Sequence, residues 1–399
     1  MQFVVNCGPH QYAKAIATSS WGRALVWSLI AAAFIGPGTV ATATRAGTLG
    51  GYGYLPVVAL AALAGYVFME MAARVTIVSQ RPLGKLLRGP DSYRGCSGVL
   101  PPILYLAIAF GCAAYQAGNL LGALGGLGLL LPVSRYWLLP LATGVAALLW
   151  WGSTRSIGRV MTVLVVGMGL LFVVAAAHIA SGENTVSVDG SGIDTSMLLA
   201  LLGTTIVPYN FFLAAGLGTG SDLPDMRRGL GLSFGVGALI TGCIVVVGSA
   251  AGSFISFGDL SATLQGVLGD YGRLVLGVGL FAAGFSSATT APLAAALAGQ
   301  QLLGFEPGGA KFRVTWIVVL LCGLTVGLTD WNMVGVIVAA QVINGLLLPF
   351  IALVVFLLAN RRGLLGQHTN RWWQNAVGAG VLAFVFYKAG QFFWSLLAA

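Results

Sequence analysis

The chain has 399 residues, of which 57% are hydrophobic and 8% are charged, and it carries a formal net charge of +9. Soluble domains contain roughly 25% charged residues. The composition therefore excludes an ordinary soluble enzyme and indicates a polytopic membrane protein. The five cysteines form no CxxC pair and no Cys/His cluster, so we expect no disulfide framework, no zinc site and no cofactor.

Eleven apolar spans are predicted, each long enough to cross a hydrocarbon core of roughly 30 Å. The first 20 residues contain no apolar run that resembles a cleavable signal, so the first span is expected to act as the insertion signal. The spans lie near residues 22–48, 54–78, 99–124, 135–152, 157–181, 196–219, 229–256, 271–298, 312–329, 332–359 and 373–397.

The basic residues predict the orientation of these spans. If the N-terminus is inside, most of the 20 Lys and Arg residues fall on inner segments. The positive-inside rule then predicts a cytoplasmic N-terminus and an outer C-terminus in a bacterial-type inner membrane. Contact with anionic membrane lipid is a sufficient explanation of the net charge. We expect no nucleic-acid partner and no obligate protein partner.

Two apolar spans are interrupted by proline. The first break is Gly36-Pro37-Gly38-Thr39 and the second is Val207-Pro208-Tyr209-Asn210. Proline removes a helix hydrogen bond, and in lipid the freed backbone groups are tolerated only where protein or water satisfies them. Matching breaks in two halves of a chain predict the binding site of a secondary transporter. Neither break contains a charged side chain.

The breaks divide the chain into two units of five spans. Because five is an odd number, the two units must insert with opposite orientations, which makes an inverted repeat. The predicted organisation is an N-terminal cytoplasmic tail at 1–20, a first repeat at 21–182, a second repeat at 195–360 and an eleventh helix at 372–399.

Six stretches resemble the Nramp family of proton-coupled divalent-metal transporters, over nearly the whole chain. The resemblance implies an all-α membrane protein with a LeuT-type 5+5 repeat and broken helices 1 and 6. The stretches are 36–42 followed by Arg45-Ala-Gly, Met69-Glu-Met-Ala-Ala-Arg74, Arg81-Pro-Leu-Gly-Lys-Leu, 203–213, 282–290, and Ala340-Gln-Val with Leu348-Pro349.

The chain departs from the family where the resemblance places its metal chemistry. The metal-binding aspartate and the asparagine of the first span fall at Gly36 and Thr39. The methionine and histidine of the sixth span fall at Val207 and Tyr209. The third-span carboxylates that move protons fall near Cys112 and Tyr115.

The predicted substrate site is therefore neutral, with no metal ligand of the usual kind. Desolvating a 2+ ion without an anionic ligand is unfavourable, whereas the N-termini of the half-helices favour an anion or a dipole. These arguments predict alternating-access transport of a small polar or anionic organic solute. The expected site residues are Gly36, Gly38, Thr39, Thr204, Thr205, Val207, Tyr209, Asn210 and Gln341.

Three alternatives remain open from the sequence. A divalent cation that keeps most of its water is one, with Mg²⁺ favoured over Mn²⁺ or Fe²⁺. A non-transporting sensor or scaffold is another. In the third, Thr39, Thr205 and Tyr209 only satisfy the backbone of a degenerate site. No enzyme motif is visible, so catalysis is not expected.

Glu70 is the single carboxylate predicted within or beside the hydrocarbon. Intramembrane acids are functional candidates, and Arg74 lies one helical turn away, at the spacing of an ion pair. We predict a structural or gating ion pair near the inner mouth, with a proton site as the alternative. Arg45, beyond the first break, either extends outward or lines an outer vestibule.

Overall fold

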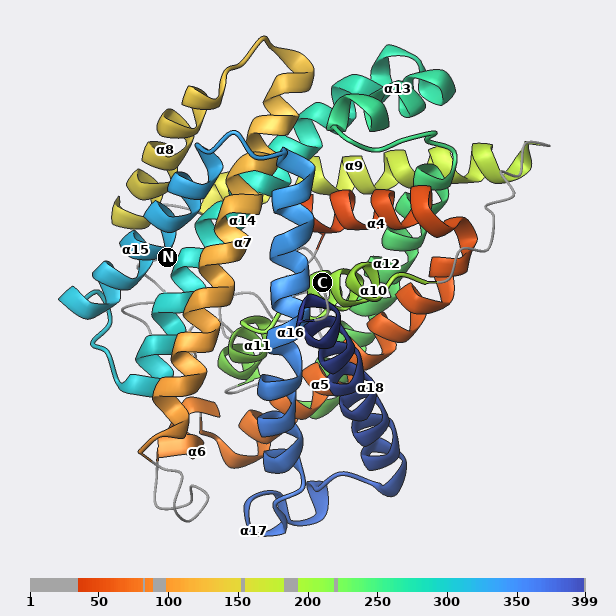
Figure 1. The fold of residues 1–399 in the computed structure, drawn as a ribbon. Coiled ribbons are helices and arrows are strands. Elements are labelled where there is room, and N and C mark those ends of the chain that lie inside the picture. The colour runs from red at the N-terminus through yellow and green to blue at the C-terminus, as the bar shows by residue number, and fades with distance from the viewer. Residues whose placement is uncertain are drawn as a thin grey trace.

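The computed structural model describes residues 35–81, 83–88, 98–151, 155–182, 193–218 and 222–397. All regular elements in these ranges are helical (Figure 1). They are α4 (Pro37–Gly50), η1 (Gly51–Tyr54), α5 (Leu55–Ser79), α6 (Leu83–Arg88), α7 (Leu100–Leu130), η2 (Arg135–Trp137), α8 (Leu138–Trp151), α9 (Arg155–Ser181), α10 (Thr195–Thr205), α11 (Asn210–Gly218), α12 (Leu223–Ser249), α13 (Phe257–Leu268), α14 (Asp270–Leu303), α15 (Ala310–Gly327), α16 (Met333–Ala359), α17 (Arg362–Leu365), η3 (Gly366–His368) and α18 (Trp372–Leu397).

The described helices account for the predicted membrane spans. Nine stretches in these ranges are long and apolar enough to cross a bilayer, and one of them runs over Pro37–Ser79. Dividing that stretch at η1 and adding the 14-residue α8 gives the eleven expected spans. The tail at 1–20 and the part of the first span before Ile35 lie outside the described residues.

The second predicted break is present in the structure, and the first lies where the described residues begin. Helix α4 begins directly after Gly36, with Pro37 in its first turn, where the missing N–H of proline costs no hydrogen bond. Helix α10 ends at Thr205 and α11 begins at Asn210, so the second break is a short non-helical segment. The chain thus has the LeuT-type inverted repeat, in which each unit of five spans begins with a broken helix.

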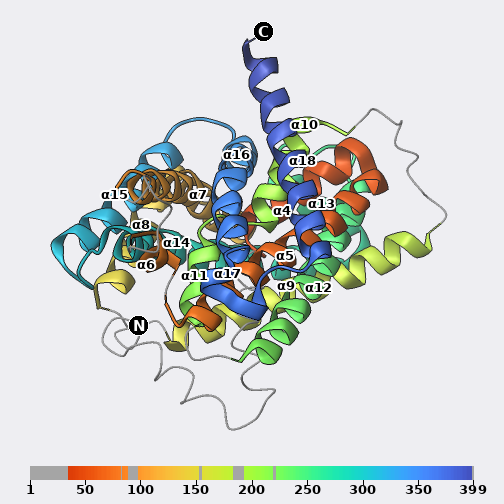
Figure 2. The same ribbon diagram turned by 90° about the horizontal axis from the view of Figure 1, so that it is seen from below.

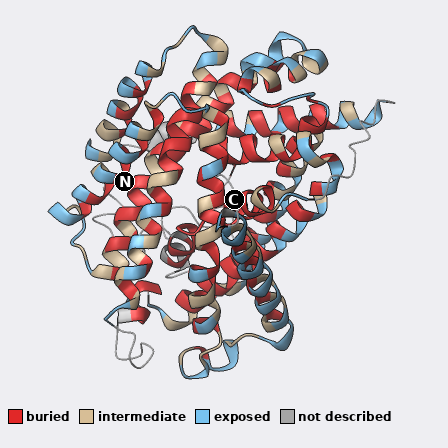
Figure 3. Ribbon diagram, in the orientation of Figure 1, coloured by how far each residue is buried: buried red, intermediate tan, exposed pale blue. Residues whose placement is uncertain are grey.

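The broken helices lie at the centre of the molecule. Helix α10 is surrounded by α4, α5 and α16, and α11 lies against α5 (Figures 1 and 2). Helix α7 packs along α14 and α15 to form the neighbouring layer. Buried residues concentrate along α10 and along the inner faces of the surrounding helices (Figure 3). A site at the breaks is therefore enclosed by protein.

Two glycines bring α10 and α16 into unusually close contact. A Cβ on Gly203 would lie 2.0 Å from the carbonyl oxygen of Gln341, and one on Gly345 would lie 2.2 Å from the carbonyl oxygen of Leu199. Small residues allow helix backbones to approach closely in membranes. This contact fixes the position of Gln341 beside the second broken helix.

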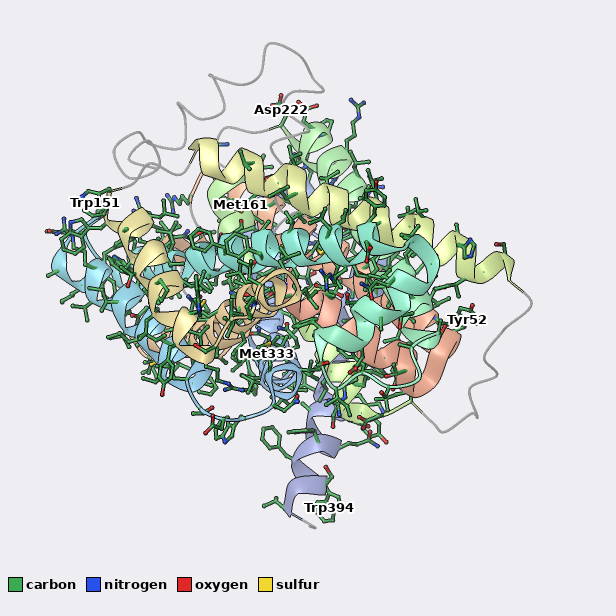
Figure 4. The ribbon with its side chains drawn as sticks, turned by 90° about the horizontal axis from the view of Figure 1, so that it is seen from above. Tyr52, Trp151, Met161, Asp222, Met333 and Trp394 are labelled. Carbon is green, nitrogen blue, oxygen red and sulfur yellow. The ribbon has the colours of Figure 1, made fainter. Side chains whose placement is uncertain are left out.

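Helix α18 is the most peripheral span. Its end extends beyond the rest of the molecule, where Trp394 is labelled (Figures 2 and 4). Trp373 is 41% exposed and Trp394 is 75% exposed. Their separation of 21 positions corresponds to about 31 Å of helix, which is close to the roughly 30 Å of a hydrocarbon core. Their spacing fits a pair of interfacial tryptophans that anchor the helix on both sides of a bilayer.

Two boundaries differ from the sequence prediction. The predicted span 229–256 is α12, which begins at Leu223 because Pro224 starts the helix and the basic residues that follow lie within it. Helix α13 was not predicted. It is an amphipathic helix between spans, and it begins with a capping box in which Ser256 and Asp259 each satisfy the other's backbone N–H.

Candidate functional site

Thr39 and Thr204 join the two broken helices. Their hydroxyl oxygens lie 2.8 Å apart, although 165 residues separate them in the sequence, and both side chains are buried. The hydrogen bond links the first turn of α4 to the last turn of α10. Of the two threonines at the end of α10, Thr204 is therefore the one that bonds the first broken helix, and its role in a substrate site remains a prediction.

Thr205 has a different role from its neighbour. Its hydroxyl donates to the carbonyl oxygen of Leu201 at 2.8 Å, one turn earlier in α10. This bond satisfies the helix backbone and uses the hydroxyl hydrogen of Thr205. The alternative that these side chains only satisfy the helix backbone therefore fits Thr205, whereas Thr39 bonds another side chain.

Gln341 lies directly against Gly38. A Cβ on Gly38 would lie 2.3 Å from Nε2 of Gln341, a distance that real side chains do not reach. Gly38 is therefore required by the close approach of the Gln341 amide to the backbone of the first break. Gln341 is 1% exposed, and its Oε1 has no hydrogen-bond partner among the described residues.

Three backbone N–H groups that follow the second break donate hydrogen bonds within the same turn. The N–H groups of Asn210, Phe211 and Phe212 donate to the carbonyl oxygens of Val207, Pro208 and Tyr209 at 3.0, 3.4 and 3.1 Å. The N-terminus of α11 thus closes into a tight turn. These three N–H groups are therefore not free for an anion, contrary to the expectation from the sequence for this half-helix.

Polar side chains at the breaks lack partners. Both amide atoms of Asn210 are buried and without a hydrogen bond within the described residues, as is the hydroxyl of Tyr115 on α7. Tyr115 makes an edge-to-face contact with Tyr209, with ring centroids 6.0 Å apart and ring planes at 75°. Buried polar groups are normally paired, and each exception requires an explanation.

The sequence prediction missed the part of this site that lies on α7. Cys112, Tyr115, Gln116 and Asn119 follow one helical face, at spacings of three and four residues. Buried atoms without a partner in the described part of the chain include Oε1 of Gln116 and Nδ2 of Asn119. The signal was present in the sequence as a polar stripe on an apolar span. The prediction considered this span only as the place where carboxylates are missing.

A second polar cluster surrounds Glu70 on α5. Its carboxylate accepts from Nε of Arg74 at 3.1 Å, from Nη2 of Arg227 at 2.9 Å and from Nε2 of Gln374 at 3.4 Å. Arg74 also donates to the backbone carbonyl of His368 and to Oδ1 of Asn370. The sequence prediction paired Glu70 with Arg74, and it missed the partners on α12 and α18.

The cluster around Glu70 is saturated with hydrogen bonds. The carboxylate is balanced by two guanidinium groups, and the buried Arg74 satisfies its donors on the connection before α18. A buried ion pair is stable only when its remaining donors and acceptors are also satisfied. This geometry fits an anchor between α5, α12 and α18. The gating role remains a prediction.

The fold and the broken helices can now be compared with known proteins. A family model described as natural resistance-associated macrophage protein-like matches residues 28–395. The chain belongs to the Nramp family. The match includes both breaks and all the described helices up to the last residues of α18.

The relatives of this Nramp chain cover most of its length. The divalent metal cation transporter MntH of Acidiphilium cryptum is 28% identical over 386 residues, which are 86% of this chain and 83% of that protein. MntH of Ralstonia nicotianae is 26% identical, covering 93% of this chain and 90% of that protein. A manganese transporter of Eremococcus coleocola has the same fold, with a TM-score of 0.73 at 18% identity and coverage of 94% and 87%.

The predicted organic solute is contradicted by these relatives. They are named as divalent metal cation transporters, so the alternative of a metal substrate agrees better with the family. The structure also weakens the physical argument for an anion, because the N–H groups at the start of α11 are used within the turn. The free groups at the breaks include oxygen atoms of neutral side chains, which a cation or its water can use.

Proposed function

We propose that this chain transports a divalent metal cation by alternating access around its two breaks. The observation that carries the proposal is the group of buried polar atoms at the breaks, on Tyr115, Asn210 and Gln341, that have no hydrogen-bond partner in the described part of the chain. Its support from outside the chain is the activity named for relatives of similar length. The transported ion is a substrate that passes through the site.

The donor set favours a hydrated ion. Oxygen ligands suit both Mg²⁺ and Mn²⁺ and imidazole suits Fe²⁺, but Mg²⁺ in particular gives up its water reluctantly. The side chains at the breaks offer amide and hydroxyl oxygens, and no carboxylate lies among them. Neutral oxygens can bind the water shell of a cation without the cost of stripping a 2+ charge. We therefore infer that Mg²⁺ is a better substrate than Mn²⁺ or Fe²⁺.

The proposal also includes the setting of transport. The chain is an integral membrane protein, and we infer an inner membrane of bacterial type with the N-terminus in the cytoplasm, from the distribution of basic residues. In this orientation the cluster around Glu70 lies near the cytoplasmic side. Membrane lipid is then the neighbour of the exposed apolar faces.

Uptake by proteoliposomes tests the function. Vesicles that contain the protein should accumulate Mg²⁺ faster than empty vesicles, with weaker accumulation of Mn²⁺ and none of amino acids or small carboxylates. Gly38→Ala should reduce uptake by about tenfold or more, the effect of losing roughly 1.4 kcal/mol of site interactions, because its Cβ displaces the Gln341 amide.

Gly235→Ala is the matched control, since a Cβ at this helical position meets no atom within 4 Å. This variant should transport like the unchanged protein. Absence of divalent-metal uptake at millimolar concentrations, with correctly folded protein in the vesicles, would overturn the proposal. Equal losses in both glycine variants would show that the contact between Gly38 and Gln341 is not part of the site.

A further inference from the structure

The space beside Gly36 is bounded by two hydroxyl groups. A Cβ at residue 36 would lie 3.3 Å from Oγ of Ser287 on α14 and 3.7 Å from the hydroxyl oxygen of Tyr115 on α7. The contact with Ser287 is tighter than an ordinary side-chain contact, and that with Tyr115 is an ordinary van der Waals distance. The space open to a side chain at residue 36 is thus bounded by hydroxyls from two other helices.

Tyr115 lies near both breaks. Its hydroxyl faces Gly36 of the first break, while its ring meets the edge or face of the Tyr209 ring in the second. The side chain is fully buried, with 0% exposure. Because the Tyr209 contact holds the ring, the hydroxyl of Tyr115 has a defined place between the two broken helices.

The hydroxyl of Tyr115 has no hydrogen-bond partner in the part of the chain that the structure describes. Leaving a buried hydroxyl unpaired costs free energy, and a phenylalanine would make the same ring contact without that cost. Asn210 and Gln341 hold further unpaired atoms on α11 and α16. Gln341 lies against Gly38, only two residues from Gly36. Tyr115 and Gln341 therefore bring unpaired atoms to the same first break, and Asn210 brings them to the second.

We propose that Tyr115 determines the cation specificity of this site. Its hydroxyl oxygen accepts a hydrogen bond from a water molecule in the shell of a hydrated divalent cation, and it occupies space that a carboxylate at residue 36 would need to reach a bare metal. The inference rests on the proposed function. It adds a residue from α7 to a site that the sequence placed on the broken helices alone.

The proposal explains why a neutral site can select one metal. Groups in the second coordination shell orient and tune the ligands of a metal, and their loss typically reduces affinity by about 10–100-fold. An ion that keeps its water shell fits hydroxyl and amide oxygens, whereas an ion that prefers direct ligands gains little from them. Tyr115 thus favours Mg²⁺ and disfavours Mn²⁺ through the same hydroxyl.

Tyr115→Phe is the first test, with Mg²⁺ uptake by proteoliposomes and the melting temperature as readouts. The KM for Mg²⁺ should rise by about tenfold, while the melting temperature stays the same or rises. Tyr105→Phe is the matched control, because the Tyr105 hydroxyl lies 2.9 Å from that of Thr315 in the scaffold. It should lower the melting temperature slightly and leave the KM unchanged.

The second test asks whether Tyr115 and a carboxylate compete for the same space. Gly36→Asp alone should bind Mn²⁺ only weakly, because Tyr115 limits the placement of the new side chain. The double variant Gly36→Asp/Tyr115→Phe should raise the ratio of Mn²⁺ to Mg²⁺ uptake by about tenfold over Gly36→Asp. A gain that exceeds the sum of the two single effects measures the coupling.

The outcomes separate the two proposals. Mg²⁺ uptake by the unchanged protein with an unaltered KM in Tyr115→Phe would overturn the role of Tyr115 and leave the proposed function standing. Equal Mn²⁺ gains in Gly36→Asp and in the double variant would overturn the competition for space. A folded, unchanged protein that takes up no divalent metal would overturn both proposals.

Discussion

The two buried polar regions of this protein follow opposite rules. Around Glu70 the charged groups are paired, and the carboxylate accepts hydrogen bonds from α5, α12 and α18. At the breaks the polar groups are neutral, and Asn210, Gln341 and Tyr115 each keep at least one atom without a partner among the described residues. The first region joins helices, and the second has hydrogen-bonding capacity left over.

The difference follows from the cost of burial. An uncompensated buried charge costs several kcal/mol, so Glu70 can remain only with its partners. An unpaired buried amide or hydroxyl costs about 1–3 kcal/mol, which a folded membrane protein can tolerate. Free capacity to bind a substrate is therefore found among neutral groups. An intramembrane carboxylate is usually a candidate for a functional site, whereas the geometry around Glu70 fits an anchor between helices.

The largest expected effect comes from breaking the anchor. Glu70→Gln removes the negative charge between Arg74 and Arg227 and leaves the fully buried Arg74 without its counter-ion. The loss should be about 3–5 kcal/mol in the free energy of unfolding, as for other buried pairs that lose one partner. Thermal unfolding in detergent, followed by tryptophan fluorescence, measures it.

The same substitution at Glu306 is the control for this prediction. Glu306 is exposed in the connection between α14 and α15, so Glu306→Gln should change the melting temperature little. If Glu70→Gln were as stable as Glu306→Gln, the cluster would not be an anchor, and the proton-site alternative for Glu70 would gain support. The charged region around Glu70 would then not differ from the neutral region at the breaks in the way described above.

An intermediate effect is expected when two asparagines are compared. Asn210→Leu removes an amide with no partner in the described residues, so the free energy of unfolding should stay the same or rise by about 1 kcal/mol. Asn370→Leu removes an acceptor of Arg74 and a donor to Asn375, and it should lower stability by about 1–3 kcal/mol. Chemical denaturation of both variants in the same detergent measures the difference.

Transport should respond in the reverse order. Asn210→Leu should lose most divalent-metal uptake, because its amide oxygen lies at the second break, whereas folded Asn370→Leu should retain it. A destabilised Asn210→Leu would mean that its amide has a partner that matters for folding. Normal uptake by Asn210→Leu would remove Asn210 from the site while leaving the anchor unaffected.

The sequence predicted those features that depend on residues close together in the chain. Proline at residues 37 and 208 gave both breaks, and the four-residue spacing of Glu70 and Arg74 matched their ion pair. It did not predict Arg227 and Gln374 as partners of Glu70, because 157 and 304 residues separate them from it in the chain. Tyr115 was missed for the same reason, since only packing brings α7 to both breaks.

The wrong substrate came from treating the breaks in isolation. An anion would need free N–H groups at the half-helix N-termini, but those of Asn210, Phe211 and Phe212 donate to carbonyl oxygens of residues 207–209. The sequence prediction also weighed only direct ligands for a metal, and so it counted a missing carboxylate as a missing site. In the proposed function, neutral oxygens from distant helices supply what the local motif lacks, and no spacing in the sequence reveals that they meet.

The smallest expected effect lies at the surface, where the carboxylate of Asp259 is stabilised mainly by backbone N–H groups. Asp259 accepts from the N–H groups of Ile255 and Ser256, both at 2.8 Å, and these hydrogen bonds lower the pKa of its carboxyl below the ordinary value. Because the folded pKa is lower than the unfolded one, the contribution of Asp259 to stability is present above about pH 3.9 and is lost as the pH falls through the folded pKa.

Hydrogen exchange of the α13 amides tests this sign. Protection should hold from pH 6 to about pH 4 in the unchanged protein and fall as the pH is lowered further, and Asp259→Asn, which keeps an acceptor oxygen for the cap but no titratable group, should show less change. An identical fall in both proteins would assign the effect to another group. The pH dependence should be confined to α13, because the capping hydrogen bonds stabilise only the first turn of that helix. A buried charge such as Glu70 needs Arg74 and Arg227 to stabilise it. An exposed charge such as Asp259 is stabilised by water as well, so its protein partners contribute less to stability.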